Sequence, residues 1–181
     1  MKKIIIIAIV IVTAFFLFTM RDNFLGSNNV PTINKTGTFH PDPSNATFIF
    51  DDESITLSEG RSEKVIVHGS ALTEETLMTD LLAYGDINSD NKEDVALLLT
   101  RSGGGSGTFI YLAAFVSGPV NYKGSEATFI GDRIAPQSIS IKGNVVTVDY
   151  LDRKVDDSFT TEPTVHTSKQ FIYKDRGFQE K

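Results

Sequence analysis

The chain has 181 residues, 40% of them hydrophobic and 22% charged, and it lacks cysteine, which excludes disulfides, cysteine-ligated zinc and cysteine nucleophiles. Its net charge at pH 7 is −6, and setting Lys2 and Lys3 aside leaves 15 basic against 23 acidic residues, a net charge of −8 for the rest. Nucleic acid is therefore not expected as a partner, because phosphate binding requires a basic surface.

The N-terminus carries the pattern of a membrane or export signal. Residues 4–18 are apolar with one exception and follow Lys2 and Lys3. A helix over residues 4–20 would span roughly 25 Å, and flanking basic side chains can extend it across a hydrocarbon core of about 30 Å. Because no small-x-small cleavage site follows, the sequence favours an uncleaved transmembrane anchor (residues 1–21) over a cleaved signal peptide. The two lysines predict a cytoplasmic N-terminus, so we expect a single-pass protein of the cell membrane with an extracytoplasmic C-terminal part.

A polar segment separates this anchor from the rest of the chain. Residues 22–43 are rich in Asn, Thr, Gly and Pro and show no sustained apolar period, which predicts a flexible linker. Residues 44–181 follow, and this length suits one domain with its own hydrophobic core. We therefore expect a single extracytoplasmic domain over residues 44–181.

Short runs of β-branched and aromatic residues, separated by turn-forming residues, predict that this domain is mostly β and antiparallel, with little helix. Three pairs of runs predict hairpins, at 45–50 with 54–57, 95–100 with 108–116, and 138–141 with 145–151. Further strands are predicted at 64–68, 127–130 and 169–173.

Residues 72–83 allow two interpretations. Their Thr-Glu-Glu start could cap a short helix with Leu77 and Leu81 on its apolar side. Alternation of apolar residues through the same segment fits a strand equally well, and we favour a strand that leads into the next loop.

The strongest chemical pattern is a polar loop that precedes the apolar run at residues 95–99. Its alternate side chains carry oxygen and can converge on one hard cation such as Ca²⁺. The sixth loop position requires a positive φ, which Asn tolerates better than most residues, and Asn91 occupies it. We predict a calcium site whose ligands are the side chains of Asp86, Asn88, Asp90 and Asp94 and the backbone carbonyl of Lys92.

The loop is not an EF-hand, because Leu97 occupies the twelfth position, where an EF-hand has a bidentate Glu. It resembles the shorter D-x-[DN]-x-D-G-x-x-D loops of integrin-type (FG-GAP) and related β-repeat proteins, with Asn91 in place of the glycine. The alternative is a polar surface turn that binds no metal, since Asn, Asp and Ser stabilise turns by bonding to the backbone. If Ca²⁺ binds, we expect it to hold the loop rather than to catalyse a reaction.

A glycine-rich segment, residues 101–108, does not indicate phosphate binding or serine catalysis. It lacks the Gly-Lys-Ser/Thr of a P-loop and precedes a predicted strand rather than a helix. Ser106 does not form a nucleophile elbow, because Thr108 occupies the place of the second glycine in Gly-x-Ser-x-Gly. We expect a flexible hairpin loop, with a mobile rim over a ligand as the alternative.

Four motifs follow one another in the predicted domain: Asn-Ala-Thr at 45–47, Gly-Asp-Ile-Asn-Ser-Asp at 85–90, Ser-Gly-Gly-Gly-Ser-Gly-Thr-Phe at 102–109 and Gly-Asp-Arg-Ile-Ala-Pro-Gln at 131–137. This succession resembles a family of small bacterial proteins that combine an N-terminal anchor or lipid signal with one domain. The resemblance covers most of residues 44–175 and implies an architecture and a location, but no activity. In that family the loop typically has glycine at the positions of Ser89 and Asn91.

Two classes of function are consistent with these patterns. The first, which we favour, is a non-catalytic binding or structural module of the cell envelope that recognises a wall polymer, a protein partner or a small ligand. The second is an envelope-associated hydrolase with carboxylates such as Asp132 and Asp152 as acids. Convergence of an Asp, His or Ser side chain with Arg133 or Arg153 in a concave pocket would favour the hydrolase.

Overall fold

The computed structural model describes residues 39–181. These residues form twelve β-strands and no helix, which confirms the prediction of a mostly β fold. The strands are β1 (Thr47–Phe50), β2 (Glu53–Thr56), β3 (Arg61–Val65), β4 (Thr73–Gly85), β5 (Asp94–Gly103), β6 (Phe109–Val116), β7 (Lys123–Gly124), β8 (Thr128–Asp132), β9 (Ala135–Lys142), β10 (Val145–Asp152), β11 (Val165–Lys174) and β12 (Gly177–Glu180).

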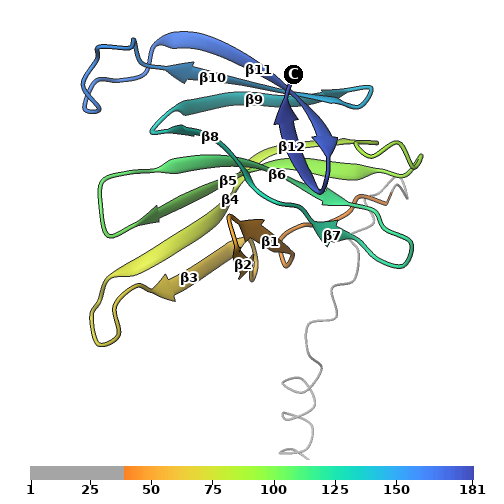
Figure 1. Cartoon of the computed structure of the whole chain (residues 1–181), viewed down its shortest axis with the longest axis horizontal. Coiled ribbons are helices and arrows are strands. Elements are labelled where there is room, and N and C mark those ends of the chain that lie inside the picture. The colour runs from red at the N-terminus through yellow and green to blue at the C-terminus, as the bar shows by residue number, and fades with distance from the viewer. Residues whose placement is uncertain (1–38) are drawn as a thin grey trace, which may run out of the picture. The chain divides into compact units, whose positions relative to one another are not determined.

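The strands form three layers (Figure 1). The central layer is a sheet in the order β3-β4-β5-β6, and both β7 and β8 pair with the other side of β6. Strands β9 to β12 form a second sheet, which packs on one face of the central sheet. The β1–β2 hairpin packs on the opposite face. All strand pairs in the three sheets are antiparallel.

Strand β5 lies at the centre of these layers because both of its faces are apolar. Val95, Leu97 and Leu99 are buried in the core beneath the β1–β2 hairpin. Ala96 and Leu98 alternate with them and are buried against the second sheet. Because complete burial of a leucine or valine side chain stabilises the fold by about 1.5–3 kcal/mol, a continuous apolar run is most stable between two layers.

The β1–β2 hairpin is joined to the central sheet by backbone hydrogen bonds as well as by apolar contacts. Ile49 N donates to Ser125 O at 3.1 Å, and Ala127 N donates to Ile49 O at 2.8 Å. Gly124 permits this close approach, because a Cβ at that position would lie 2.1 Å from Thr47 O. The hairpin is therefore attached beside β7. It covers only part of its face of the sheet, because Phe109 and Phe129 on that face are 39% and 53% exposed.

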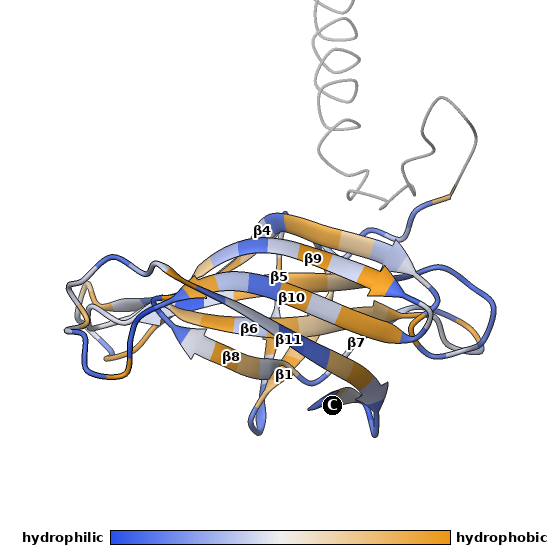
Figure 2. Cartoon of the chain, turned by 90° about the horizontal axis from the view of Figure 1, so that it is seen from above, coloured by the Kyte–Doolittle hydropathy of each residue, from blue (hydrophilic) through white to orange (hydrophobic). Residues whose placement is uncertain are grey.

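The larger core lies between the central sheet and the second sheet. Val146, Val148 and Tyr150 occupy alternate positions of β10 and point into this core, together with Phe171 and Phe178. Figure 2 shows apolar segments alternating with polar ones along the strands of the second sheet. This alternation is the pattern from which most of these strands are predicted.

The three predicted hairpins are confirmed and correspond to β1–β2, β5–β6 and β9–β10. Residues 73–83 belong to the strand β4, which confirms the strand that we favour for the segment 72–83. Their pattern is ambiguous because both faces of β4 are covered: Met78 and Leu82 pack against the hairpin core, whereas Leu81 packs against the second sheet.

Three strands differ from expectation. The strand predicted at 64–68 is β3, Arg61–Val65, because the chain turns back after it: Ile66 N donates to Leu72 O at 2.9 Å, and Gly69 has a φ of 83°. The strands β7 and β12 were not predicted, since both are short and neither has an alternating apolar pattern.

The predicted anchor, residues 1–21, lies outside the described residues. Within residues 39–181, no helix of sufficient length and hydrophobicity to span a membrane is found. The end of the predicted linker contacts the domain. The rings of Phe39 and Tyr122 are 6.0 Å apart, and His40 Nδ1 lies 2.5 Å from Glu93 Oε1.

Candidate functional site

The predicted calcium loop joins β4 to β5 and is held by hydrogen bonds from its backbone to its side chains. Both carboxylate oxygens of Asp86 accept N–H groups, from Asp90 at 3.2 Å and from Asn91 at 2.9 Å. Asn88 Oδ1 also accepts from Asp90 N, at 3.0 Å, and Asp90 Oδ1 accepts from Lys92 N at 2.9 Å. Three of the predicted ligand side chains therefore direct oxygens into the same turn.

The backbone of the loop has the left-handed conformation predicted for its sixth position. Asn91 has a φ of 63°, and Ser89 has a φ of 64°. Glycine adopts a positive φ without steric cost, and Asn tolerates it better than most other residues.

Asp94 begins β5 and is completely buried. Its Oδ2 accepts hydrogen bonds from Ile87 N at 2.9 Å and from Asn88 N at 3.3 Å, and its Oδ1 accepts from Ser117 N at 2.8 Å. Three N–H donors satisfy a carboxylate that would otherwise be costly to bury. Asp94 thus ties the loop to the end of β6.

Ser117 makes a second connection between the loop and the end of β6. Its hydroxyl donates to Asp90 Oδ2, and this hydrogen bond lowers the pKa of Asp90. Asn88 Nδ2 donates to Ser117 O at 3.1 Å. Lys92 Nζ lies 3.7 Å from Asp90 Oδ2 and donates to Gly118 O at 3.3 Å. The loop and residues 117–118 therefore form one hydrogen-bonded unit.

The loop fits a hard cation in part. Asp86, Asn88 and Asp90 retain lone pairs beyond their hydrogen bonds, and such oxygens are the ligands that Ca²⁺ prefers. Asp94 would have to exchange backbone donors for the metal ion. Across residues 39–181, no group of three or more His, Asp or Glu side chains is arranged to hold a metal. Calcium binding by this loop stays a prediction.

Arg133 and Arg153 lie next to each other, and both side chains are engaged in contacts within the protein. Arg153 Nη1 donates to Arg133 O at 2.7 Å, and its Nε donates to Thr161 O at 2.5 Å. The guanidinium of Arg133 lies 4.6 Å from the ring centroid of Phe159 and 3.3 Å from Asp132 Oδ2. These contacts fix the loops that follow β8 and β10.

The two candidate acids of the hydrolase hypothesis also accept backbone groups. Asp132 Oδ1 accepts from Thr108 N at 3.2 Å, and Asp152 Oδ1 accepts from Arg153 N at 2.7 Å. Asp132, the acid that pairs with Arg133, precedes it directly in the sequence, an arrangement typical of a local ion pair. This geometry gives both carboxylates a structural role.

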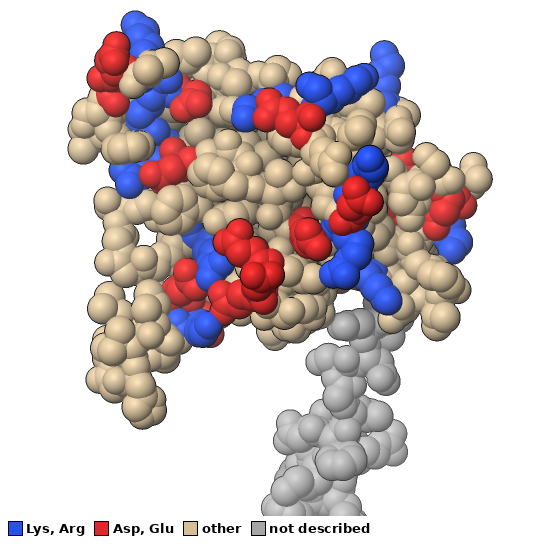
Figure 3. Space-filling model, in the orientation of Figure 1, with Lys and Arg blue, Asp and Glu red and all other residues tan. Residues whose placement is uncertain are grey.

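A charged cluster that the sequence did not predict lies where the β1–β2 hairpin meets the central sheet. It consists of Glu53, Lys64, Glu74 and Arg101. Arg101 Nη2 donates to Glu53 Oε2 at 2.7 Å and to Glu74 Oε2 at 2.6 Å, and Lys64 pairs with Glu53. The hydrogen bond from Lys64 lowers the pKa of Glu53, and the bond to Glu74 raises the pKa of Arg101. Figure 3 shows acidic and basic side chains gathered side by side in this region.

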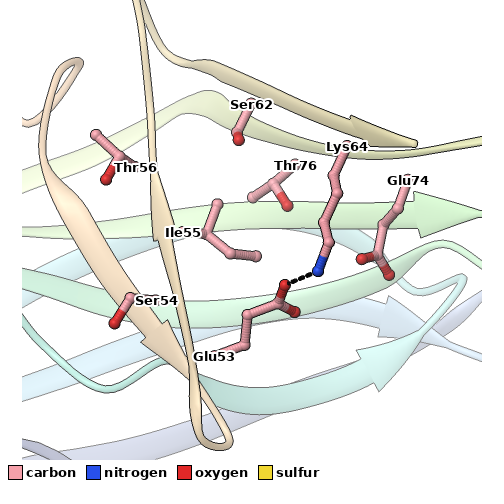
Figure 4. A pocket seen from close by; sticks show the side chains of 8 residues that line it. All are labelled: Glu53, Ser54, Ile55, Thr56, Ser62, Lys64, Glu74 and Thr76. Carbon is pink, nitrogen blue, oxygen red and sulfur yellow. Dashed lines mark hydrogen bonds and ion pairs between the residues drawn. The ribbon is translucent and has the colours of Figure 1, made fainter. Parts of the chain in front are cut away.

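A small cavity of about 100 Å³ adjoins the charged cluster (Figure 4). Figure 4 shows Glu53, Lys64 and Glu74 on one side of it, with Ser54 and Thr56 on the other. A cavity of this volume holds a few water molecules or one ligand group, and not a whole substrate. The complete lining is Glu53, Ser54, Ile55, Thr56, Ser62, Lys64, Glu74 and Thr76.

Aromatic rings continue from the charged cluster along the same face of the central sheet. The guanidinium of Arg101 lies 5.4 Å from the ring centroid of Phe50, which packs edge to face with Tyr111 at 4.9 Å. Tyr111 lies 5.6 Å from Phe129, and Phe129 lies 6.3 Å from Phe109. Phe129 and Phe109 are 53% and 39% exposed. We call Phe109, Tyr111 and Phe129 the aromatic surface.

The sequence does contain a signal for the aromatic surface. Phe109 and Tyr111 alternate with Ile110 and Leu112, so β6 is apolar on both faces. Such a strand is expected to pack on two sides. Since β1–β2 covers only part of one side, Phe109 remains exposed.

Comparison of the chain with protein-family models, curated proteins and solved structures finds no match. The resemblance to a family of small bacterial anchored proteins therefore stays a prediction. The function is inferred from the geometry of the site.

Proposed function

We propose that the protein is a non-catalytic binding module of the cell envelope, anchored by residues 1–21 and with residues 44–181 outside the membrane. The observation that carries this proposal is the aromatic surface, in which Phe109 and Phe129 expose neighbouring rings beside the charged cluster. Contiguous exposed apolar groups with a polar rim are typical of interaction sites. The apolar residues 4–18 and the acidic charge of the rest support the location.

Binding is favoured over hydrolysis because the carboxylates near concave surfaces are already engaged. Glu53 and Glu74 line the small cavity, and both are paired with Arg101. A general acid requires a raised pKa, whereas the pKa of Glu53 is lowered. Asp132 and Asp152 accept backbone N–H groups.

Sedimentation with purified cell-wall sacculi tests the binding function, with the full chain in lipid nanodiscs. The double variant Phe109→Ser/Phe129→Ser removes both exposed rings. Val120 and Val155, which are 95% and 101% exposed, provide the matched control Val120→Ser/Val155→Ser. We expect the parent and the control to sediment and the aromatic variant to stay in solution. No sedimentation of the parent, or equal sedimentation of both variants, would overturn the proposal.

The proposed location is tested separately. We expect the full chain to stay in the membrane fraction after an alkaline carbonate wash, because an apolar anchor is not held by charge. We also expect protease added outside spheroplasts to digest residues 44–181. Release by the wash, or protection from the protease, would contradict the location.

We further propose that Ca²⁺ is a structural ion of the loop. The carboxylate and amide oxygens that Asp86, Asn88 and Asp90 direct into one turn support this proposal. Asp94 and the carbonyl of Lys92 complete the predicted ligand set.

Calorimetric titration of the full chain with Ca²⁺ tests this site. We expect the parent to bind Ca²⁺ and to gain melting temperature, and Asp86→Ala and Asp90→Ala to lose both effects. Asp52→Ala, at an exposed hairpin turn, is the control and should behave as the parent. If the parent shows neither heat nor a higher melting temperature, the loop is a metal-free turn.

A further inference from the structure

The aromatic surface lies on the part of the central sheet that the β1–β2 hairpin leaves uncovered. Strand β6 supplies Phe109 and Tyr111, and β8 supplies Phe129, which lies between them at ring distances of 6.3 and 5.6 Å. Flat apolar rings suit the C–H face of a sugar, whose hydroxyl edge then remains free for polar groups. A row of rings on an open sheet face favours an extended glycan over a compact ligand, which would require a deep pocket.

The basic side chains of the charged cluster, which lie beside these rings, are all paired with carboxylates. Arg101 is paired with both Glu53 and Glu74, and Lys64 is also paired with Glu53. The carboxylates neutralise both basic side chains of the charged cluster. An acidic polymer would therefore meet no uncompensated positive charge here.

Two carboxylates at the adjoining hairpin turn are uncompensated. Asp51 and Asp52 are exposed, and no hydrogen bond or ion pair from residues 39–181 reaches either side chain. Burial raises the pKa of Tyr111; the charge of Arg101 opposes this effect and the charge of Asp51 adds to it. Asp51 directly follows Phe50, whose ring packs 4.9 Å from that of Tyr111, so this uncompensated charge lies beside the aromatic surface and complements a cation.

We propose that this surface binds a glycan that carries protonated amino groups, such as a polymer of de-N-acetylated amino sugars. Phe109 and Phe129 contact the sugar faces, and Asp51 and Asp52 pair with the ammonium groups. The neighbouring rings add cation–π attraction. This assignment rests on the binding function proposed above and specifies its ligand class.

Calorimetry with two defined sugars tests the assignment. The full chain in phosphatidylcholine nanodiscs is titrated at pH 5.5 with a glucosamine hexamer, whose amines are charged, and with an N-acetylglucosamine hexamer, which is neutral. We expect the glucosamine hexamer to bind about tenfold more tightly, from ion pairs and cation–π contacts at an exposed site. This preference should shrink as salt is added.

Two variants separate the charges from the rings. Asp51→Asn/Asp52→Asn removes both charges, and Asn is compatible with the φ of 51° at position 51. We expect it to bind the glucosamine hexamer about tenfold more weakly than the parent, at an unchanged melting temperature. Asp175→Asn is the matched control, since Asp175 is also exposed in a hairpin turn, with a φ of 50°. Phe109→Ser/Phe129→Ser should lose binding of both hexamers.

The outcomes distinguish this assignment from the broader function. Equal or tighter binding of the N-acetylated hexamer, or unchanged affinity of the Asp51→Asn/Asp52→Asn variant, overturns the assignment. If neither hexamer binds while the parent still sediments with sacculi, the ligand class is wrong and the envelope-binding function stands. If sedimentation also fails, both are wrong.

Discussion

Asp94→Asn should destabilise the protein whether or not metal is present. The carboxylate of Asp94 is completely buried and accepts N–H groups of Ile87, Asn88 and Ser117 at 2.9, 3.3 and 2.8 Å. Asn replaces one acceptor oxygen by an NH₂ group that faces donors. Because a hydrogen bond to a charged group is worth about 1.5–3 kcal/mol, we expect a loss of roughly 2–4 kcal/mol. For a domain of this size, that lowers the melting temperature by roughly 5–15 °C.

Thermal unfolding of the full chain, followed by the near-ultraviolet circular dichroism of its tyrosines, measures this effect. Asp52→Asn makes the same chemical change at an exposed position and should leave the melting temperature unchanged. Both variants are compared with the parent in EDTA and in Ca²⁺. If Asp94→Asn matches the parent in EDTA and differs only in Ca²⁺, then Asp94 acts through the metal and the three backbone bonds contribute little.

The same unfolding assay tests two further features. Leu98→Ala, in the core between the sheets, should lower the free energy of unfolding by about 2–5 kcal/mol. Val155→Ala, at an exposed position, should change it by less than about 0.5 kcal/mol. Equal effects of the two substitutions would contradict the layered core. Hydrogen bonds from Ser168 and Ser138 lower the pKa of Asp149. Since its folded pKa is below the unfolded value of about 3.9, its stabilisation is complete above that value and is lost as the pH falls through the folded pKa. Asp149→Asn should therefore lose stability less steeply than the parent as the pH falls below about 4. Identical slopes of stability against pH would contradict this role of Asp149.

Local patterns were sufficient to predict most of the strands. The short apolar run at residues 95–99, bounded by turn-forming residues, and the alternation at 145–151 are typical of strands, and β5 and β10 follow from them. The turn that ends β3 and the short strands β7 and β12 depend on partners distant in sequence. For example, β12 exists because Phe178 reaches the core beside Phe171.

The candidate loop could be located from sequence because its residues are contiguous. Positive φ at Asn91 was expected from its position alone. The role of Asp94 was not, since Ser117, whose N–H donates to it, lies 23 residues away, and only the pairing of β5 with β6 brings the two together. Spacing alone cannot distinguish a metal ligand from a buried acceptor of backbone donors.

The sequence by itself determined the chemistry that is local: a membrane-anchor pattern, an acidic β-rich domain, a polar loop and the strand that follows it. Only the tertiary structure decided which side chains meet and which remain exposed. Arg101 meets Glu53 and Glu74 because three strands converge there, and Phe109 stays exposed because the small hairpin ends before it covers that part of β6. Burial is a property of packed layers, and no single segment of a chain specifies it.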